Sequence, residues 1–552
     1  MVNMKRSLVL LLTLAFALAG CAGGGTQEAA GGADSAPNSG DAGAAGPVKI
    51  RVFMPQDAKT DLETNAFTKH VEEKFNIDFE ITTTTFDGTA SAEKRKIALA
   101  SGDYPDLFLL IAWLDKFSQA ELLQYGKQGV LLPLNDLIKA HAPNIQKVLD
   151  EHPYYKAMAT APDGNIYGLP QLIECYHCSY PAKMWINTDW LETLNLNMPT
   201  TPEEFKQVLT AFKTQDPNGN GQADEIPLSG TIAWPETLPI PFFMNGFIYD
   251  NSTNRLLLRD GKVDYAANKP EFRDGLAYIA SLYKEGLIDP GTFSQNAEAY
   301  QQLGNNASAP ILGAGPAMHP NVLVSDQNYT KSYDPVPPLK GPNTAHATYS
   351  FPSTPGGSFV LTNKASEEAQ VAAIKLVDYL FTQEGQILGY FGKEDVDWRK
   401  PSEGDKALNE EAEPLLVPIP DTPNQTPDNT GWGPIAQFHQ PKSFRDGWVQ
   451  GDDIYVLSGY ERRLQQATQL YDGAEPDEVF PHWAVWIDPA VADEFAMLET
   501  NIKDYVEQNS LQFITGSKNL DTEWDAYVEG LEKLNLKRYL EIMQQAYDNA
   551  EF

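Results

Sequence analysis

The sequence contains little cysteine and little positive charge. Only 3 of its 552 residues are cysteine, which excludes a small scaffold held together by many disulfides. Lysine and arginine number 41 against 75 aspartates and glutamates, which gives a net charge of −34. Because such an excess of acid repels a phosphate backbone and an anionic membrane surface, nucleic acid is excluded as a partner.

Long apolar runs and common enzyme signatures are also missing. Beyond residue 20 no stretch has the roughly 18 consecutive apolar residues of a membrane-spanning helix. The patterns GxSxG, HExxH and GxxxxGKS/T are absent, so the enzyme classes that they identify are not indicated. We therefore predict no catalytic residues. A glycoside hydrolase stays open as an alternative, because its two carboxylates follow no fixed spacing.

The N-terminus has the features of a secreted lipoprotein. Lys5 and Arg6 precede a short apolar run that ends in small residues, which is typical of a secretory signal. The stretch Leu18-Ala19-Gly20-Cys21 resembles the bacterial lipobox, in which the cysteine thiol receives a lipid and becomes the first residue. We predict a signal peptide over residues 1–20 and lipidation of Cys21. An ordinary signal peptide with an incidental cysteine is the alternative.

Residues 21–46 follow as a predicted flexible tether. Small and polar residues dominate this segment, which has no aromatic and no basic residue. Such a composition buries too little apolar surface to offset the entropy of ordering the chain. The protein is therefore predicted to be a folded body attached by lipid to the extracellular face of the cell membrane.

The sequence after the tether predicts an α/β architecture with more than one hydrophobic core. A βαβαβ unit begins with strand-like alternation over 48–53, helical spacing over 67–75 and β-rich residues at 77–83. It ends in an apolar run at 107–111. Ligands of open parallel sheets bind beyond the carboxyl ends of the strands. We divide the chain into lobe 1 (47–170), lobe 2 (171–345), a return to lobe 1 (346–400) and a Pro-rich loop with C-terminal helices (401–552) that complete lobe 2 and the hinge.

Several segments resemble the extracellular solute-binding protein family 1 of ABC importers, in particular its large lipoprotein branch for oligosaccharides. They are found at 97–106, at 163–170, at 188–191 and at Gly516 together with 524–528, in the family's order. The resemblance implies a two-lobed periplasmic-binding-protein-like fold of type II, with crossover segments and a helical C-terminal region. It also implies a monomer that closes on an oligosaccharide and delivers it to the membrane subunits of the permease. A peptide-binding protein that serves a membrane sensor is a further alternative.

A loop in the predicted second lobe has the composition of a calcium site. Short oxygen-bearing side chains alternate around Gly221, and calcium prefers many oxygens on a flexible loop. Pro227 stands where an EF-hand has its bidentate glutamate, so the last ligands must come earlier. Relatives of the large lipoprotein branch have a similar loop that holds calcium. The predicted ligands of a structural calcium ion are Asp216, Asn218, Asn220, Gln222, Asp224 and Glu225; an Asn/Gly turn without metal is the alternative.

Sugar recognition needs flat apolar faces and short polar side chains, usually in a cleft between lobes. The predicted substrate-binding residues lie after the first strand, in loops or at the lobe crossovers. Arg399 would meet an acidic sugar, and a solvated surface arginine is the alternative. The full set is Gln56, Asp57, Trp113, Glu174, Tyr176, His177, Trp234, Trp398, Arg399 and Trp432. For each tryptophan, packing in the core is the competing interpretation.

Cys175 and Cys178 form a single CxxC pair. No second pair or suitably spaced histidine completes a zinc site, so we predict no zinc here. Residues three apart in an extended strand face opposite sides, and a disulfide between them requires a turn. A disulfide and two free thiols both remain open.

Overall fold

The computed structural model describes residues 46–306, 309–351, 353–419 and 427–550. Cys21, the signal peptide and nearly all of the predicted tether lie outside these ranges. Residues from Pro47 onward form one compact unit, which contains two four-stranded sheets. Over the described part of the chain, no helix combines the length and the apolar character needed to cross a membrane.

The first sheet has the strand order β11-β3-β1-β2. β1 (Val48–Gln56) runs parallel to β2 (Ile77–Thr85) and to β3 (Leu107–Leu109), which confirms the predicted βαβαβ unit. At one edge of this sheet, β11 (Phe359–Leu361) pairs antiparallel with β3. This strand reaches the sheet only after the chain has built the second lobe.

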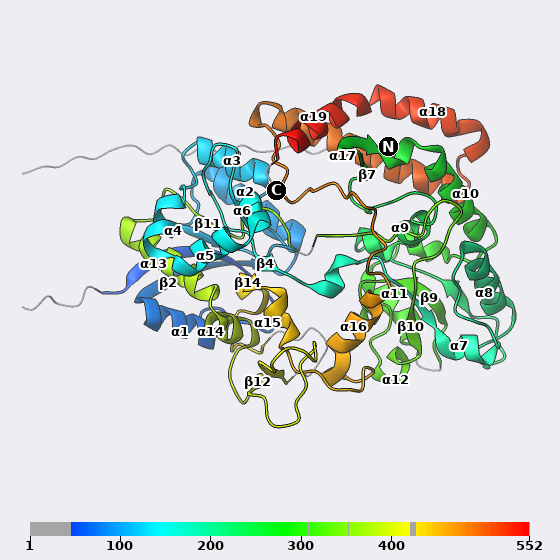
Figure 1. Ribbon diagram of the computed structural model, residues 1–552, viewed down its shortest axis with the longest axis horizontal. Helices are drawn as coiled ribbons and strands as arrows, with labels where there is room; N and C mark the ends of the chain where they lie inside the picture. The colour runs from blue at the N-terminus through cyan, green and yellow to red at the C-terminus, as the bar shows by residue number, and fades with distance from the viewer. Residues whose placement is uncertain (1–45, 307–308, 352, 420–426, 551–552) are drawn as a thin grey trace, which may run out of the picture. The chain divides into compact units, whose positions relative to one another are not determined.

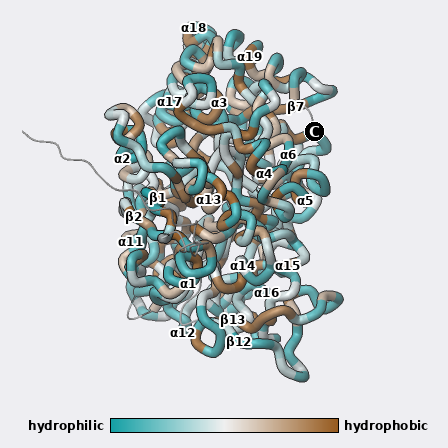
Figure 2. Tube along the Cα trace, turned by 90° about the vertical axis from the view of Figure 1, so that its left-hand side faces the viewer, coloured by the Kyte–Doolittle hydropathy of each residue, from teal (hydrophilic) through white to brown (hydrophobic). Residues whose placement is uncertain are grey.

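The helices of this lobe begin and end where local chemistry dictates. Asp87 caps α2 (Gly88–Ser101), and Gly102 ends it with a φ of 76°, a conformation that suits glycine. The buried side chains of α13 (Glu367–Leu380) pack in one core with β1, β3 and β11, and Figure 2 colours this helix mainly brown. The other helices are α1 (Ala66–Phe75), α3 (Gln119–Lys127), α4 (Asn135–His141), α5 (Pro143–Glu151), α6 (Pro153–Ala159) and α14 (Gln383–Gln386).

The second sheet has the strand order β10-β5-β9-β6. Its strands are β5 (Met184–Asn187), β6 (Ile226–Leu228), β9 (Leu312–Pro316) and β10 (Tyr333–Val336). The Thr201 side chain caps α8 (Pro202–Thr214), and the Glu204 carboxylate accepts from the backbone amide of Thr200, one residue before the cap. The buried stripe of α8, which includes Phe205 and Leu209, packs in the core of this lobe.

Further elements surround the second sheet. They are α7 (Thr188–Thr193), α9 (Pro239–Met244), α10 (Pro270–Lys284), α11 (Ala297–Gly304), α12 (Gln327–Thr330), α16 (Tyr460–Gln469) and the hairpin of β7 (Leu256–Arg259) and β8 (Lys262–Tyr265). The predicted helical C-terminus is present as α17 (Ala492–Thr515), α18 (Leu520–Lys533) and α19 (Leu536–Asp548). These three helices pack on α10 and on the hairpin, which Figure 1 shows in orange and red beside green segments. The Tyr527 hydroxyl, for example, donates to the carbonyl of Ala267 at 3.0 Å.

The chain crosses between the two sheets through neighbouring segments. The first crossing contains β4 (Leu172–Ile173) and the 3-10 helix η1 (Tyr176–Ser179), drawn in teal in Figure 1. The second crossing leads from β10 back to β11, and its Ser350 amide donates to the Ser179 carbonyl of the first at 2.8 Å. β14 (His439–Gln440) pairs with β4, followed by α15 (Lys442–Asp446); β12 (Trp398–Arg399) and β13 (Val417–Pro418) form a separate ribbon.

Candidate functional site

Gln56 and Asp57 organise the loop that follows β1. The Gln56 side-chain oxygen accepts from the Leu62 amide at 3.3 Å, and one Asp57 oxygen accepts from the amides of Lys59 and Thr60 at 2.9 Å each. Both side chains are half-buried. They lie at the carboxyl end of the parallel strands, where the sequence predicts a ligand, and they hold the loop in one conformation.

An exposed aromatic pair lies at the same edge of the sheet. Trp113, after β3, is 57% exposed, and Phe86, after β2, is 37% exposed. Their ring centroids are 5.5 Å apart in an edge-to-face arrangement. Trp113 thus presents an aromatic surface to solvent. Phe86 is missing from the predicted set, although its place directly after a strand is the same signal that selected Gln56.

A buried ion pair fixes the loop that carries Trp113. The guanidinium of Arg95 binds the Asp115 carboxylate at 3.0 Å, and both side chains are 2% exposed. It also contacts Glu121 at 3.2 Å and donates to the Lys116 carbonyl at 2.9 Å. Burial lowers the pKa of Lys116, whose ammonium donates to the Ala112 carbonyl, to about 8. The loop therefore holds Trp113 on a rigid support.

The other predicted tryptophans divide into one exposed and two buried side chains. Trp234, after β6 in the second lobe, is 47% exposed. Trp398 and Trp432 are 6% and 2% exposed, and each donates its indole N–H internally, to the carbonyl of Gly392 and to the hydroxyl of Thr68. Contrary to the prediction, these two pack in apolar cores and present no face to a sugar.

The structure brings Glu174, Tyr176 and His177 together at the first crossing. They line a cavity of about 250 Å³ with several residues from α15 and α16. Glu174 accepts from the Tyr154 hydroxyl at 2.5 Å and from the Lys442 amide at 2.6 Å, so both of its oxygens are engaged. Burial, followed by the charge of Asp472, raises the pKa of the Tyr176 hydroxyl to about 12.

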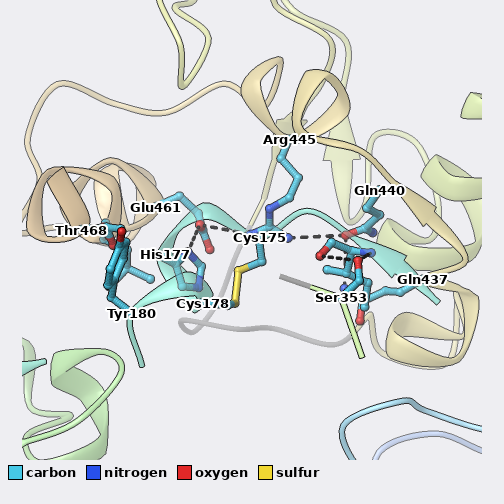
Figure 3. The surroundings of a disulfide bond; sticks show 12 residues. Cys175, His177, Cys178, Tyr180, Ser353, Gln437, Gln440, Arg445, Glu461 and Thr468 are labelled. Atoms are coloured by element: carbon cyan, nitrogen blue, oxygen red, sulfur yellow. Dashed lines mark hydrogen bonds and ion pairs between the residues drawn. A yellow bond between two sulfur atoms is a disulfide. The ribbon is translucent and has the colours of Figure 1, made fainter. Parts of the chain in front are cut away.

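His177 belongs to a buried charged cluster beside this cavity. Its Nδ1 lies 3.2 Å from Glu461, which also contacts the Arg445 guanidinium at 3.5 Å, as the dashed lines in Figure 3 show. Burial lowers the pKa of His177, and Arg445 and Lys183 act in the same direction. Burial alone would raise the pKa of Glu461, but the neighbouring groups outweigh it and lower that pKa to about 2. The cluster thus places the Glu461 carboxylate between the imidazole of His177 and the guanidinium of Arg445.

Arg399 does not offer an unpaired charge. Its guanidinium binds the Asp405 carboxylate at 2.7 and 3.2 Å, and it lines a cavity of about 230 Å³ near β13. A sugar carboxylate would have to displace Asp405 from Arg399. This pairing removes the reason for selecting Arg399 as the contact of an acidic sugar.

In the loop over 216–225, two of the predicted calcium ligands contact the Asp224 carboxylate. The side-chain amides of Asn218 and Asn220 donate to Asp224 at 3.1 Å, and the Gly221 amide donates to Asp216 at 3.0 Å. Oε1 of Glu225 is buried and has no hydrogen-bond partner among the described residues. Burial, then the charges of Asp216 and Asp224, raises the pKa of Glu225. A cation would supply the missing partner of Glu225, and the oxygen-rich donor set suits calcium once the two amides turn their oxygens inward.

Cys175 and Cys178 form a disulfide. Helix η1 provides the turn that such a bond requires, with the Cα atoms 5.2 Å apart. Of the two alternatives that the sequence left open, the structure therefore has the bonded one.

Comparison with known proteins identifies the family of this chain. Residues 60–387 match the model of bacterial extracellular solute-binding proteins. This chain belongs to that family. The fructooligosaccharide ABC transporter substrate-binding protein FusA of Streptococcus pneumoniae serotype 4 is 31% identical over 483 residues, which cover 83% of this chain and 82% of FusA.

Solved structures of this solute-binding family agree with the fold. FusA of S. pneumoniae in complex with kestose has a TM-score of 0.72 at 27% identity, covering 91% of this chain and 99% of FusA. A FusA EF-hand mutant in complex with fructo-nystose superposes with the same score. An HMO-binding solute-binding protein from Bifidobacterium longum infantis shares the fold, with a TM-score of 0.74 at 23% identity. The match covers 92% of this chain and 99% of that protein. The predicted two-lobed α/β fold with a helical C-terminal region is confirmed.

Proposed function

We propose that this solute-binding protein serves a carbohydrate ABC importer and captures an oligosaccharide between its two lobes. The observation that carries the proposal is the likeness to FusA over more than four-fifths of both chains. Two lobes joined by neighbouring crossings are the architecture that closes around a ligand by hinge motion. The partners would be the membrane subunits of a permease, and the protein would act as a monomer, without catalysis.

Within this function, exposed aromatic faces would contact the sugar. Trp113 and Phe86 belong to the first lobe and Trp234 to the second, and all three are more than a third exposed. Gln56 and Asp57 at the edge of the first sheet, and Tyr176 at the crossing, would meet sugar hydroxyl groups. Since Arg399 is paired with Asp405, a neutral sugar fits these surroundings better than an acidic one.

The anchoring and the calcium site complete the proposal. A diacylated Cys21 would hold the protein at the extracellular face of the membrane, with residues 22–46 as its tether. A calcium ion would bind Asp216, Asn218, Asn220, Gln222, Asp224 and Glu225 and brace the second lobe. The buried, unpartnered oxygen of Glu225 supports this ion, and so does the existence of an EF-hand mutant of FusA.

Calorimetric titration with panels of oligosaccharides and peptides tests the function. We expect saturable binding of a neutral oligosaccharide, such as kestose or a longer fructan fragment, and no release of smaller sugars from it. Hydrolysis of the bound sugar would favour the surface-anchored glycoside hydrolase, and peptide binding without any sugar signal would favour the peptide-binding, sensor-presenting lipoprotein.

The variant Trp113→Ala tests the aromatic contact. Loss of the stacking face should weaken sugar binding about tenfold, or about 1.4 kcal/mol. Ile97→Ala is the matched control, because Ile97 in the same lobe is 68% exposed and lies on α2. Both variants should keep wild-type melting temperatures. Equal affinity of Trp113→Ala and wild type would remove Trp113 from the site.

A further inference from the structure

The crossing contains a cluster of metal-binding donors that the sugar site does not use. One ligand atom from each of Cys175, His177 and Cys178 lies within 4.8 Å of the other two. Figure 3 shows the imidazole of His177 beside the two sulfur atoms. Two thiolates and an imidazole are ligands that thiophilic d¹⁰ cations such as Zn²⁺ and Cu⁺ prefer, whereas calcium and magnesium prefer oxygen.

The surroundings of His177 match those of a metal-bound histidine. Nδ1 of its ring faces a Glu461 oxygen at 3.2 Å, and Arg445 holds the same carboxylate from the other side at 3.5 Å. A histidine that binds a metal almost always gives its second ring N–H to a carboxylate or a carbonyl, which fixes the tautomer and the orientation of the ring. The contact with Glu461 puts the proton on Nδ1 and leaves Nε2 with a lone pair for a cation.

The disulfide determines when this site exists. In the bonded form the two sulfur atoms have no thiolate to offer, so the oxidised protein has only the imidazole. An external dithiol can donate two electrons and two protons, which breaks the S–S bond, leaves two cysteine thiols and converts the dithiol to its own disulfide. A cation then displaces the two thiol protons.

We propose that the reduced protein binds one thiophilic cation, Zn²⁺ or Cu⁺, through Cys175, His177 and Cys178, with Glu461 as the positioning residue of the imidazole. The Cα atoms of the two cysteines lie 5.2 Å apart, because Cys175 directly precedes the short helix η1 that contains Cys178, so the backbone keeps the two side chains close together after reduction. A water molecule would be the fourth ligand of such an ion. The site shares no residue with the calcium loop, and it adjoins Tyr176, which the proposed function places in contact with sugar hydroxyl groups.

Co²⁺ is the spectroscopic probe for the experiment. The full chain with Cys21→Ser leaves Cys175 and Cys178 as its two thiols, since the sequence has 3 cysteines. The protein is reduced with a phosphine, freed of reductant under anaerobic conditions and saturated with Ca²⁺ so that the acidic loop is occupied. Titration with Co²⁺ should give a thiolate-to-cobalt charge-transfer band that saturates at one ion per chain, and Zn²⁺ should abolish the band by displacement.

Four variants and the oxidised protein locate the ion. The oxidised protein and Cys175→Ser should show no such charge-transfer band, and His177→Gln should bind the ion much more weakly. Glu461→Gln should bind Co²⁺ about 10–100-fold more weakly while keeping the band, because it only orients the imidazole. His141→Gln, on the distant helix α4, should match the parent chain. Absence of the band in the reduced parent chain, or identical titrations of the parent chain and His177→Gln, would overturn the proposal.

Discussion

The buried pair of Arg95 and Asp115 allows a quantitative prediction. Substitution of Arg95 by methionine removes the positive charge but keeps much of the apolar volume beside Phe117, whose ring lies 4.4 Å from the guanidinium carbon. Asp115 then keeps only the Ser91 hydroxyl, at 3.1 Å, of the side-chain partners that bind it in the wild type. The carboxylate is only 2% exposed, so water cannot replace the arginine without local opening.

The expected cost of Arg95→Met follows from this burial. Removal of one partner from a buried ion pair typically destabilises a protein by about 3–5 kcal/mol, because the remaining charge stays in a medium of low polarity. Replacement of both partners by apolar residues avoids that penalty and is often close to neutral. We therefore expect the double variant Arg95→Met/Asp115→Leu to recover most of the stability that Arg95→Met loses.

Urea unfolding measures both variants. The midpoint of Arg95→Met should shift to lower urea, with an unchanged slope, and the calculated free energy of unfolding should fall by about 3–5 kcal/mol. Lys139→Met on α4, an exposed lysine, is the control and should be near wild type. A loss below about 1 kcal/mol, or a double variant no more stable than Arg95→Met, would refute the reasoning that the pair is desolvated.

Three further predictions concern the calcium loop and the second sheet. With calcium at 100 times its Kd, chelation should lower the free energy of unfolding by about 2.7 kcal/mol, seen as a lower Tm by scanning calorimetry, and Asp224→Asn should abolish the effect. The raised pKa of Glu225 means that its carboxyl group binds a proton more tightly in the metal-free loop than in the unfolded chain, so calcium must displace that proton. Titrations should therefore show weaker calcium binding and more proton release as the pH falls from 7 toward 5. Calcium binding that does not depend on pH would contradict the prediction. Gly315→Ala in β9 should cost about 1–3 kcal/mol in urea unfolding, because its Cβ would overlap the Tyr300 hydroxyl, and Tyr300→Phe in the same chain should restore part of the loss.

Periodic patterns in the sequence were sufficient to predict the alternating strands and helices of the first lobe and the C-terminal helices. These elements depend on neighbouring residues, as in the capping of α8 by Thr201, and such signals are local. The edge strand β11 was not predicted as antiparallel, because its orientation depends on the path of the chain through the second lobe.

The candidate site was less predictable for the same reason. Trp113 follows an apolar run and Trp398 stands between charged residues, yet Trp113 is 57% exposed and Trp398 only 6%, since tertiary packing decides which tryptophan is covered. Glu461, which contacts His177, and Arg445, which binds Glu461, are remote from His177 in sequence and lie in segments of mostly polar composition. The pattern of oxygens around Gly221, in contrast, is short and continuous, and it was visible in the sequence.

The alternation of the chain between the two sheets has a consequence for its biosynthesis. The first sheet lacks its edge strand until residues 359–361 have been made, and the core of the second lobe lacks Tyr539 and Ile542 until almost the whole chain is complete. A nascent chain that leaves the ribosome or the export channel residue by residue thus exposes one open sheet edge and one unfinished apolar core at the same time. Neither half can reach its final state alone, so a chain truncated before α19 should be recognised as unfolded by proteases and folding factors, however complete its first lobe.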